Sequence, residues 1–217
     1  TTNGKKVVSI TEFSPEKLLI SCFNDRLYIF DKRTAKLTSF LLIDNHTTRK
    51  EFTQGDLINL YATSDEIYIF GSNIYVYNRH TQHTKQLPIP SHLDRESFIH
   101  AQPIHADNQY IYILSYKSLL QIEKTSKNIA QLFGVSDDEF LSSACIDNQG
   151  KFWIGSNYAL YHYNAASQQA EKIQNVLFHN IQSLTSDDKN RIWIGANNQL
   201  LVYLRNEDRI VMLDKTD

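Results

Sequence analysis

The tripeptide Trp-Ile-Gly occurs twice in this sequence, at residues 153–155 and 193–195. Each copy follows a segment rich in Asp and Asn and precedes a run that contains tyrosine. The two tryptophans lie 40 residues apart, which is too far for neighbours within one strand or helix. A repeat of about 40 residues is typical of one four-stranded blade of a β-propeller. The spacing therefore predicts a repetitive β fold.

Three weaker copies precede these two. Tyr112, Tyr68 and Leu19 take the tryptophan position, so that successive anchors from Leu19 to Trp193 are separated by 49, 44, 41 and 40 residues. Each copy divides into four short runs of β-branched, aromatic or alternating apolar residues, separated by polar turns. We therefore predict a single all-β domain or fragment, a β-propeller of about five four-stranded blades that is either a closed ring or an arc of a larger propeller. The predicted blades span residues 5–43, 56–90, 98–133, 140–174 and 180–213.

The repeated aromatic and glycine positions are expected to serve packing. One four-stranded sheet that is apolar on both faces is not stable alone, and stacking neighbouring sheets buries its anchors. We expect Gly71, Gly155 and Gly195 where a neighbouring backbone or a turn comes too close for a Cβ atom. The predicted structural anchors are Leu19, Tyr68, Tyr112, Trp153, Trp193, Gly155 and Gly195.

An aspartate recurs at the first turn of four copies. In a tight turn, an Asp side chain accepts hydrogen bonds from backbone N–H groups about two residues further on. We expect this role for Asp65, Asp107, Asp147 and either Asp187 or Asp188.

Charge and hydropathy argue against several classes of partner. The chain has 22 Lys and Arg against 24 Asp and Glu, a formal net charge of −2, so no global field attracts nucleic acid or an anionic membrane. No window approaches the roughly 18 continuous apolar residues of a membrane span.

Cys22 and Cys145 lie in apolar runs without an activating neighbour. We expect buried unpaired thiols there, with one disulfide as the alternative.

Catalytic and metal-binding arrangements are poorly represented. Glycosidases need two or three carboxylates that face one another, but the predicted inner strands carry only Asp56. The pairs His80/His83 and His100/His105 lack the third ligand that a catalytic zinc requires. We expect no enzyme activity, no metal and no cofactor in this segment.

A ligand-binding surface remains the favoured site. In a propeller, the turns between second and third strands and the connections between blades share one end of the sheets. Aromatic faces with planar amides and arginine suit a sugar ring and its hydroxyls, although turn formation and rim packing explain the same residues. The candidate contacts are Tyr116, Tyr158, Asn157, Asn197, Asn73, Asn24, Arg49, Arg95 and His92.

The stretch IDNQGKFWIGSNYALYHYN at residues 146–164 and its echo at 186–204 resemble the two-component regulator propeller repeat. The consensus of that repeat is roughly Asp-x-x-Gly-x-Leu-Trp-Ile-Gly-Thr-x-x-Gly-Leu-x-x-Tyr. Its late glycine is Ala159 in one copy and Gln199 in the other, and the upstream copies keep only the outline. The residues that follow the consensus are Asp147, Gly150, Trp153, Ile154, Gly155, Ser156, Leu160 and Tyr163, then Asp187 or Asp188, Trp193, Ile194, Gly195, Leu200 and Tyr203.

The resemblance implies the periplasmic sensor region of a membrane-anchored hybrid two-component histidine kinase of Bacteroidetes. Such regions typically sense breakdown products of complex polysaccharides. We therefore expect an extracytoplasmic ligand-sensing module for oligosaccharides, with no catalysis in this segment. A structural protein-interaction propeller without a small ligand and a glycan-active enzyme are the alternatives. The expected partners are an oligosaccharide, neighbouring propeller or sensor domains of the parent chain and a second copy in a homodimer. No nucleic acid is expected, and a membrane is expected only through the parent chain.

Overall fold

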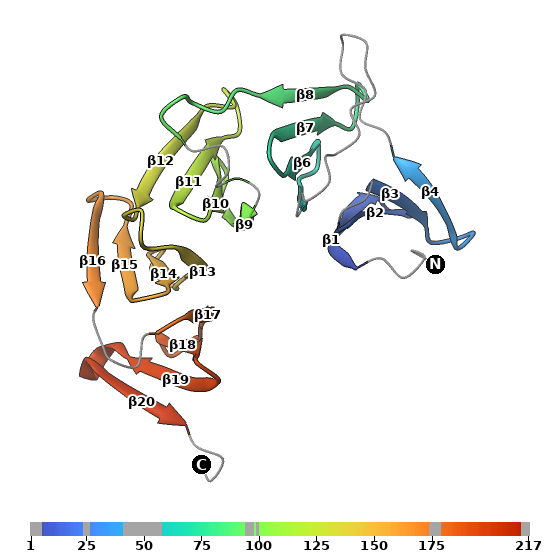
Figure 1. The fold of residues 1–217 in the computed structure, drawn as a ribbon. Helices are drawn as coiled ribbons and strands as arrows, with labels where there is room; N and C mark the ends of the chain where they lie inside the picture. The colour runs from blue at the N-terminus through green and yellow to red at the C-terminus, as the bar shows by residue number, and fades with distance from the viewer. Residues whose placement is uncertain are drawn as a thin grey trace. The chain divides into compact units, whose positions relative to one another are not determined.

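The structure is a computed structural model that describes residues 6–23, 27–40, 58–93, 98, 100–173 and 179–213. Within these residues, 20 β-strands form five four-stranded antiparallel sheets (Figure 1). In each sheet, every strand pairs with the next one along the chain. The predicted all-β class and the four-stranded unit are confirmed. No helix in the described part of the chain is long and apolar enough to cross a membrane.

The strands follow one another in chain order. The first sheet contains β1 (Val7–Ser14), β2 (Lys17–Cys22), β3 (Leu27–Asp31) and β4 (Lys36–Phe40). The second contains β5 (Asn59–Ala62), β6 (Glu66–Phe70), β7 (Ile74–Asn78) and β8 (Thr84–Leu87). The third contains β9 (Gln102–Ala106), β10 (Tyr110–Leu114), β11 (Ser118–Glu123) and β12 (Ile129–Gly134). The fourth contains β13 (Leu141–Ile146), β14 (Phe152–Ser156), β15 (Leu160–Asn164) and β16 (Gln169–Ile173). The fifth contains β17 (Ile181–Ser186), β18 (Arg191–Ala196), β19 (Gln199–Leu204) and β20 (Arg209–Leu213), with the short 3-10 helix η2 (Arg205–Glu207) before β20.

The chain forms two compact units, residues 1–103 and 104–217, which divide within β9. The first unit holds the first and second sheets. The second unit holds the fourth and fifth sheets and most of the third.

The anchors share one register position in the second strand of each sheet. Trp153 in β14 lies opposite Cys145 in β13, and Trp193 in β18 lies opposite Thr185 in β17. The corresponding places in β2, β6 and β10 are taken by Leu19, Tyr68 and Tyr112. Because the registers agree, residues of different sheets can be compared position by position.

Apolar cores lie between neighbouring sheets within each unit. In the first unit, Leu19 of the first sheet packs in one cluster with Leu60 and Ile69 of the second sheet. In the second unit, Trp153 packs in a cluster with Ile192 of the fifth sheet. Leu19, Tyr68, Tyr112 and Trp153 are buried, whereas Trp193 is only half-buried.

Serines join the first strands of consecutive sheets. The Oγ of Ser9 in β1 accepts a hydrogen bond from the N–H of Leu60 in β5, at 3.2 Å. In the second unit, the Oγ of Ser143 in β13 accepts a hydrogen bond from the N–H of Leu184 in β17, at 2.9 Å. Ser9 lies opposite Ser21 and Ser143 lies opposite Gly155, two residues beyond the anchor in each case. The same contact therefore recurs in both units.

Three of the four predicted turn aspartates cap their turns. Oδ1 of Asp147 accepts hydrogen bonds from the N–H groups of Gln149 and Lys151, at 2.9 and 3.0 Å. Asp107 and Asp187 cap the N–H two residues on in the same way, so Asp187 rather than Asp188 has this role. Asp65 differs from the prediction: its carboxylate accepts hydrogen bonds from the Ser64 hydroxyl and the His80 ring. There the hydroxyl of Thr63 accepts the turn hydrogen bond from the Glu66 N–H.

The two Trp-Ile-Gly glycines have different neighbours from those predicted. A Cβ on Gly155 would lie 2.4 Å from Cγ2 of Ile181, a side chain of the next sheet rather than backbone. The nearest atoms to a Cβ on Gly195 belong to Ser183 of the same sheet. The close approach at Gly155 arises because β17 packs over the end of β14.

The two cysteines do not form a disulfide. Cys22 is buried and Cys145 is partly buried. Burial, with the nearby charge of Asp147, raises the pKa of the Cys145 thiol to about 12. Since the thiolate is the reactive form, Cys145 is expected to be a poor nucleophile.

Candidate functional site

Two turns of the second unit display tyrosines at the end of the sheets where a ligand was predicted. In the β14–β15 turn, the N–H of Ser156 donates to the carbonyl of Ala159 and the Ser156 hydroxyl accepts from the Ala159 N–H, both at 2.9 Å. Ser115 and Ser118 form the same pair of bonds across the β10–β11 turn. A serine thus fixes each of the two hairpins. Tyr116 in the β10–β11 turn is 39% exposed, and Tyr158 in the β14–β15 turn is 51% exposed.

Phe140 lies between these two turns. Its ring stacks on that of Tyr116, with 5.1 Å between centroids and 1° between planes. Its backbone N–H donates to Oδ1 of Asn157 at 2.9 Å, and its carbonyl accepts from the Asn157 N–H at 3.1 Å. We call Tyr116, Phe140 and Tyr158 the aromatic surface. The structure therefore brings the predicted residues Tyr116, Asn157 and Tyr158 together around one connection.

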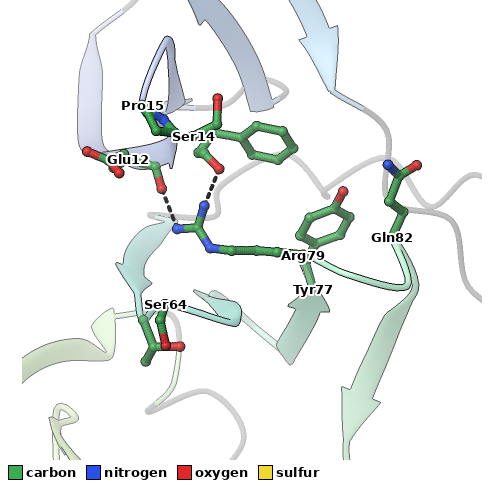
Figure 2. Close-up of a pocket in the computed structure, with 9 residues that line it drawn as sticks. Glu12, Ser14, Pro15, Ser64, Tyr77, Arg79 and Gln82 are labelled. Atoms are coloured by element: carbon green, nitrogen blue, oxygen red, sulfur yellow. Dashed lines mark hydrogen bonds between the residues drawn. The ribbon is translucent and has the colours of Figure 1, made fainter.

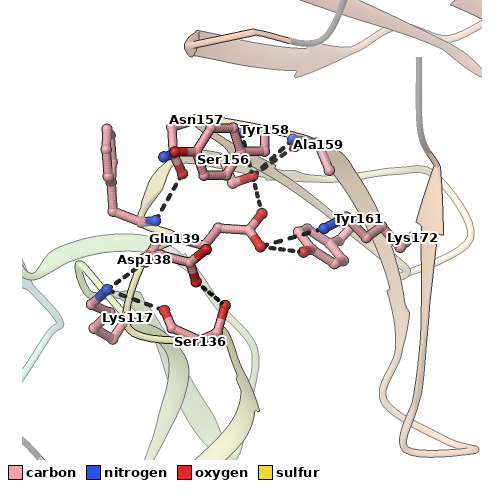
Figure 3. Close-up of polar contacts among 11 residues, drawn as sticks. Lys117, Ser136, Asp138, Glu139, Ser156, Asn157, Tyr158, Ala159, Tyr161 and Lys172 are labelled. Carbon is pink, nitrogen blue, oxygen red and sulfur yellow. Dashed lines mark hydrogen bonds and ion pairs between the residues drawn. The ribbon is translucent and has the colours of Figure 1, made fainter. Parts of the chain in front are cut away.

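The connection between β12 and β13 is fastened by two charged side chains (Figure 3). The ammonium of Lys117 donates to the carbonyls of Ser136, Asp137 and Glu139, at 3.2, 2.7 and 2.5 Å. The carboxylate of Glu139 is buried and accepts hydrogen bonds from the hydroxyls of Ser156 and, at 2.8 Å, Tyr161. Lys172 lies 3.5 Å from the same carboxylate. Both ends of the connection are therefore held in place.

The electrostatics of this cluster favour a neutral Tyr161 phenol and a charged Lys172 ammonium beside the Glu139 carboxylate. Burial raises the pKa of Tyr161, and the hydrogen bond to Glu139 raises it further, so the phenol remains a neutral donor. The hydrogen bond to Tyr161 and the charge of Glu139 raise the pKa of Lys172. Because a buried carboxylate must be paired and hydrogen-bonded, we interpret Glu139 as a positioning group for the aromatic surface.

The other predicted contacts lie elsewhere. Oδ1 of Asn73 accepts a hydrogen bond from Nε2 of Gln86 at 2.9 Å, in the first unit. His92 is exposed in the same unit. Asn197 is exposed in the β18–β19 turn with a φ of 47°. Asn24, Arg49, Arg95 and the acidic candidate Asp56 lie outside the described residues.

Sequence reasoning missed Phe140, Glu139 and Lys117 as individual residues. Residues 134–139 connect two predicted blades, and such connections are predicted at this end of the sheets, but an acidic run in a connection is typical of solvated surface. The available signal was Phe140 directly after three acidic residues. An aromatic residue at the end of a polar connection indicates that the connection is anchored at that residue.

A second candidate is a cavity of about 370 Å³ in the first unit, at the opposite end of its sheets (Figure 2). The guanidinium of Arg79 donates to the backbone carbonyls of Phe13 and, at 2.7 Å, Glu12. The arginine thereby joins the β7–β8 turn to the end of β1. The cavity is lined by Glu12, Phe13, Ser14, Pro15, Thr63, Ser64, Tyr77, Arg79 and Gln82.

This arginine contact has a counterpart in the second unit. Arg205 follows β19 as Arg79 follows β7, and its Nη1 lies 2.7 Å from Oδ2 of Asp147 in the preceding sheet. Its guanidinium also lies over the ring of Trp153, 5.0 Å from the centroid. We therefore interpret Arg79 as a structural link between sheets and not as a ligand-binding charge.

Metal coordination has no support in the described part of the chain. No group of three or more His, Cys, Asp or Glu side chains gathers there in a way that could hold an ion. His80 instead lies 3.0 Å from the carboxylate of Asp65.

No protein-family model and no curated protein matches this sequence. Solved structures match it clearly. The extracellular domain of the hybrid two component system BT4673 from B. thetaiotaomicron has a TM-score of 0.70 and 20% identity, over 91% of this chain and 27% of that chain. For BT3049 of the same organism the TM-score is 0.71 and the identity 16%, over 95% and 30%. Virginiamycin B lyase from Staphylococcus aureus has a TM-score of 0.70 and 14% identity, over 98% and 71%.

These neighbours are propeller-type structures. The fold is a β-propeller. The chain spans little more than a quarter of the length of the BT4673 domain. Two of the three neighbours are extracellular domains of hybrid two-component systems, the class of protein that the sequence resemblance indicated, and the third is an enzyme. At identities of 20% or less, the similarity establishes the propeller fold but not an activity.

Proposed function

We propose that this chain is an extracytoplasmic, periplasmic ligand-sensing module of a two-component signalling protein, and that oligosaccharides bind its aromatic surface. The observation that carries the proposal is the exposure of Tyr116 and Tyr158 on turns that are already fixed by hydrogen bonds. Exposed rigid aromatic rings offer faces on which a sugar ring can stack with little loss of side-chain entropy. The extracellular two-component domains of the same fold support the sensory role.

The aromatic surface is connected to the packing between the fourth and fifth sheets. Asn157 binds the backbone of Phe140, and its own carbonyl accepts a hydrogen bond from the N–H of Asn180 at 3.0 Å. Asn180 directly precedes β17. A sugar that shifts Tyr158 or Phe140 would therefore act on the first strand of the next sheet. In this proposal, phosphotransfer takes place in other parts of the parent protein.

The test is a thermal-shift screen of the chain against oligosaccharides of plant, host and microbial origin. A ligand that binds only the folded form stabilises it by RT ln(1 + [L]/Kd), about 2.7 kcal/mol at a ligand concentration of 100 Kd. We expect a saturable rise in Tm for at least one oligosaccharide. Tyr116→Ala and Tyr158→Ala should each abolish this rise.

Met212→Ala is the matched control, because Met212 is 49% exposed on β20 and is not part of the aromatic surface. It should keep the full thermal shift. A shift that survives both tyrosine substitutions would place the ligand elsewhere. Turnover of the bound saccharide would favour a glycan-active enzyme, and no shift across the panel would favour a protein-interaction propeller.

A further inference from the structure

One histidine lies beside the packing between the fourth and fifth sheets. His162 in β15 lies opposite Trp153 in β14, and its ring stacks on the indole with 4.5 Å between centroids and 23° between planes. Trp153 is buried in the core that the two sheets share. The side chain of His162 is 16% exposed. A change of charge on His162 therefore takes place next to the contact between the sheets.

The surroundings of the His162 ring offer poor acceptors for a second N–H. Within the described residues, its buried Nε2 atom has no hydrogen-bond partner. Its Nδ1 atom lies 4.0 Å from the carboxylate of Glu171 in β16, which is too far for a hydrogen bond. A neutral imidazole has one N–H donor, whereas a charged imidazolium has two. Because a buried donor without an acceptor costs free energy, this environment favours the neutral ring.

A cation already lies beside the same indole. The guanidinium of Arg205, which follows β19 in the fifth sheet, is 5.0 Å from the centroid of Trp153. Its Nη1 atom lies 2.7 Å from Oδ2 of Asp147, so this carboxylate is already paired. An indole face attracts a cation, but a second positive charge on His162 would be repelled by the first. Protonation of His162 therefore opposes the arginine contact that joins the two sheets.

The charged groups around His162 act in both directions. Burial lowers the pKa of His162 below its ordinary value of 6.5. The positive charges of Lys151 and Arg205 lower it further, and the negative charges of Asp147 and Glu171 offset this only in part. Glu171 is 77% exposed, so water screens its charge. A group whose pKa is lower in the folded state stabilises the fold above its unfolded pKa, and this stabilisation disappears as pH falls through the folded pKa.

Two further titratable groups that face this packing stay uncharged. Burial and the hydrogen bond to Asp208 raise the pKa of Tyr203 in the fifth sheet to about 12. Cys145 lies opposite Trp153 in β13, and its thiol pKa of about 12 keeps it protonated. Histidine is the side chain whose ordinary pKa lies between about pH 5 and 8. His162 therefore carries the response of this packing to mild acid.

We propose that His162 makes the contact between the fourth and fifth sheets sensitive to pH, so that mild acid loosens it. Protonation places a charge beside Arg205 and leaves an N–H of the imidazolium without an acceptor. Both effects are relieved when the two sheets separate and water reaches the ring. This pH response is independent of whether the aromatic surface binds a sugar.

The test is the hydrogen exchange of single backbone amides in the intact chain, measured by NMR at about pH 7.5 and about pH 5.5, on either side of the ordinary histidine pKa. The N–H of Leu184 in β17 donates to Oγ of Ser143 in β13 across the contact, so it exchanges when the sheets separate. Its protection factor, which corrects for the intrinsic effect of pH on exchange, should fall several-fold in acid, by at most about tenfold per pH unit. The N–H of Leu60, which donates to Ser9 in the first unit, should keep its protection.

A substitution of the histidine separates its titration from its packing. His162→Phe keeps a ring that can stack on Trp153 but cannot be protonated, so the protection of Leu184 should be the same at both pH values. His105→Phe is the matched control, because His105 also stacks on an anchor, Tyr112, at 6.0 Å, but is exposed. It should keep the wild-type pH dependence. Circular dichroism verifies folding, and His162→Gln replaces His162→Phe if that variant unfolds.

Three outcomes would overturn the proposal. The first is a wild-type chain in which the protection of Leu184 does not change with pH. The second is an equal fall in protection in His162→Phe, which would assign the titration to another group. The third is an equal fall at Leu60, which would show that acid acts on the whole chain and not on this contact.

Discussion

In the last three repeats, a single aspartate in the first turn joins turn geometry to core packing. One carboxylate oxygen of the aspartate caps the turn, and the other binds the anchor. Oδ2 of Asp147 accepts a hydrogen bond from Nε1 of Trp153 at 3.0 Å, and Oδ2 of Asp107 accepts one from the Tyr112 hydroxyl at 2.8 Å. The polar edge of a large buried ring is thereby satisfied.

Replacing Trp153 by Phe tests the anchor bond. The variant keeps an aromatic ring but loses the Nε1–H that the buried carboxylate of Asp147 accepts. We expect a loss of about 1.5–3 kcal/mol in the free energy of unfolding, the range for a hydrogen bond to a charged group, plus the loss from the smaller ring. Urea unfolding measures it. Trp193→Phe should lose less free energy of unfolding than Trp153→Phe, because Trp193 is half-buried. Equal losses in the two variants would contradict the role of burial.

The turn aspartates also predict how stability depends on pH. Burial would raise the pKa of Asp147, but hydrogen bonds from Trp153 and the turn N–H groups and the charge of Arg205 lower it below 3.8. The pKa of Asp107 is lowered mainly by its hydrogen bonds from Tyr110, Tyr112 and Gln109, against burial. A group whose pKa is lower in the folded state stabilises the fold above its unfolded pKa, and this stabilisation disappears as pH falls through the folded pKa.

We therefore expect the free energy of unfolding contributed by these carboxylates to be constant above about pH 5 and to decrease below pH 4. Asp147→Asn should be less stable than the wild type at pH 7, and the difference should narrow at pH 3. Urea titrations at the two pH values measure both quantities. A difference that is the same at pH 3 and pH 7 would show that the charge of Asp147 is not involved.

At the scale of strands and sheets, the structure depends on close insertion of one first strand over the preceding sheet. Ile181 of β17 lies over Gly155 of β14, and the Ser143–Leu184 hydrogen bond fixes the position of β17. The insertion buries Trp153 and Leu160 against the fifth sheet.

Gly155→Ala tests this insertion. The added Cβ would lie 2.4 Å from Cγ2 and 3.0 Å from Cβ of Ile181, so β17 must move. Overpacking of this kind typically costs about 1–3 kcal/mol, measurable by urea unfolding of the dilute chain. Gly195→Ala is the matched control, since its Cβ would meet only the Ser183 hydroxyl closely, and that side chain can rotate. A larger loss for Gly195→Ala would refute this account.

At the scale of the whole molecule, the two compact units each have their own core and one cysteine. Cys22 belongs to the first unit, and Cys145 packs against the core between the fourth and fifth sheets. In repeat proteins, stability is approximately a sum of intrinsic and nearest-neighbour terms. A weakened contact should therefore expose nearby residues without exposing those in distant repeats.

Arg205→Met tests this locality. Loss of the contacts to Asp147 and Trp153 should make the reaction of Cys145 with a thiol reagent several-fold faster, because the fourth and fifth sheets separate more often. Cys22 should react at its wild-type rate. Arg79→Met, at the same repeat position in the first unit, should leave the Cys145 rate unchanged. Faster reaction of both cysteines in either variant would indicate one cooperative structure.

Much of the fold follows from local sequence. The Trp-Ile-Gly spacing, the turn aspartates and the four apolar runs predicted the all-β propeller and the common register of Trp153 and Trp193. The assignment of their turns between second and third strands also predicted that Tyr116, Asn157 and Tyr158 lie at one end of the sheets. These features are predictable because they depend on residues within one repeat, where short-range geometry governs turns and pairing.

Contacts between repeats could be decided only by the tertiary structure. Trp153 and Trp193 stand in the same sequence pattern, but Trp153 is buried because the fifth sheet covers it, whereas Trp193 is only half-buried. Phe140 joins the aromatic surface because Asn157 of one turn binds its backbone and Tyr116 of another turn stacks on its ring. Burial and pairing of this kind depend on which surfaces come together in space, and residues far apart in the chain do not encode that in any local pattern.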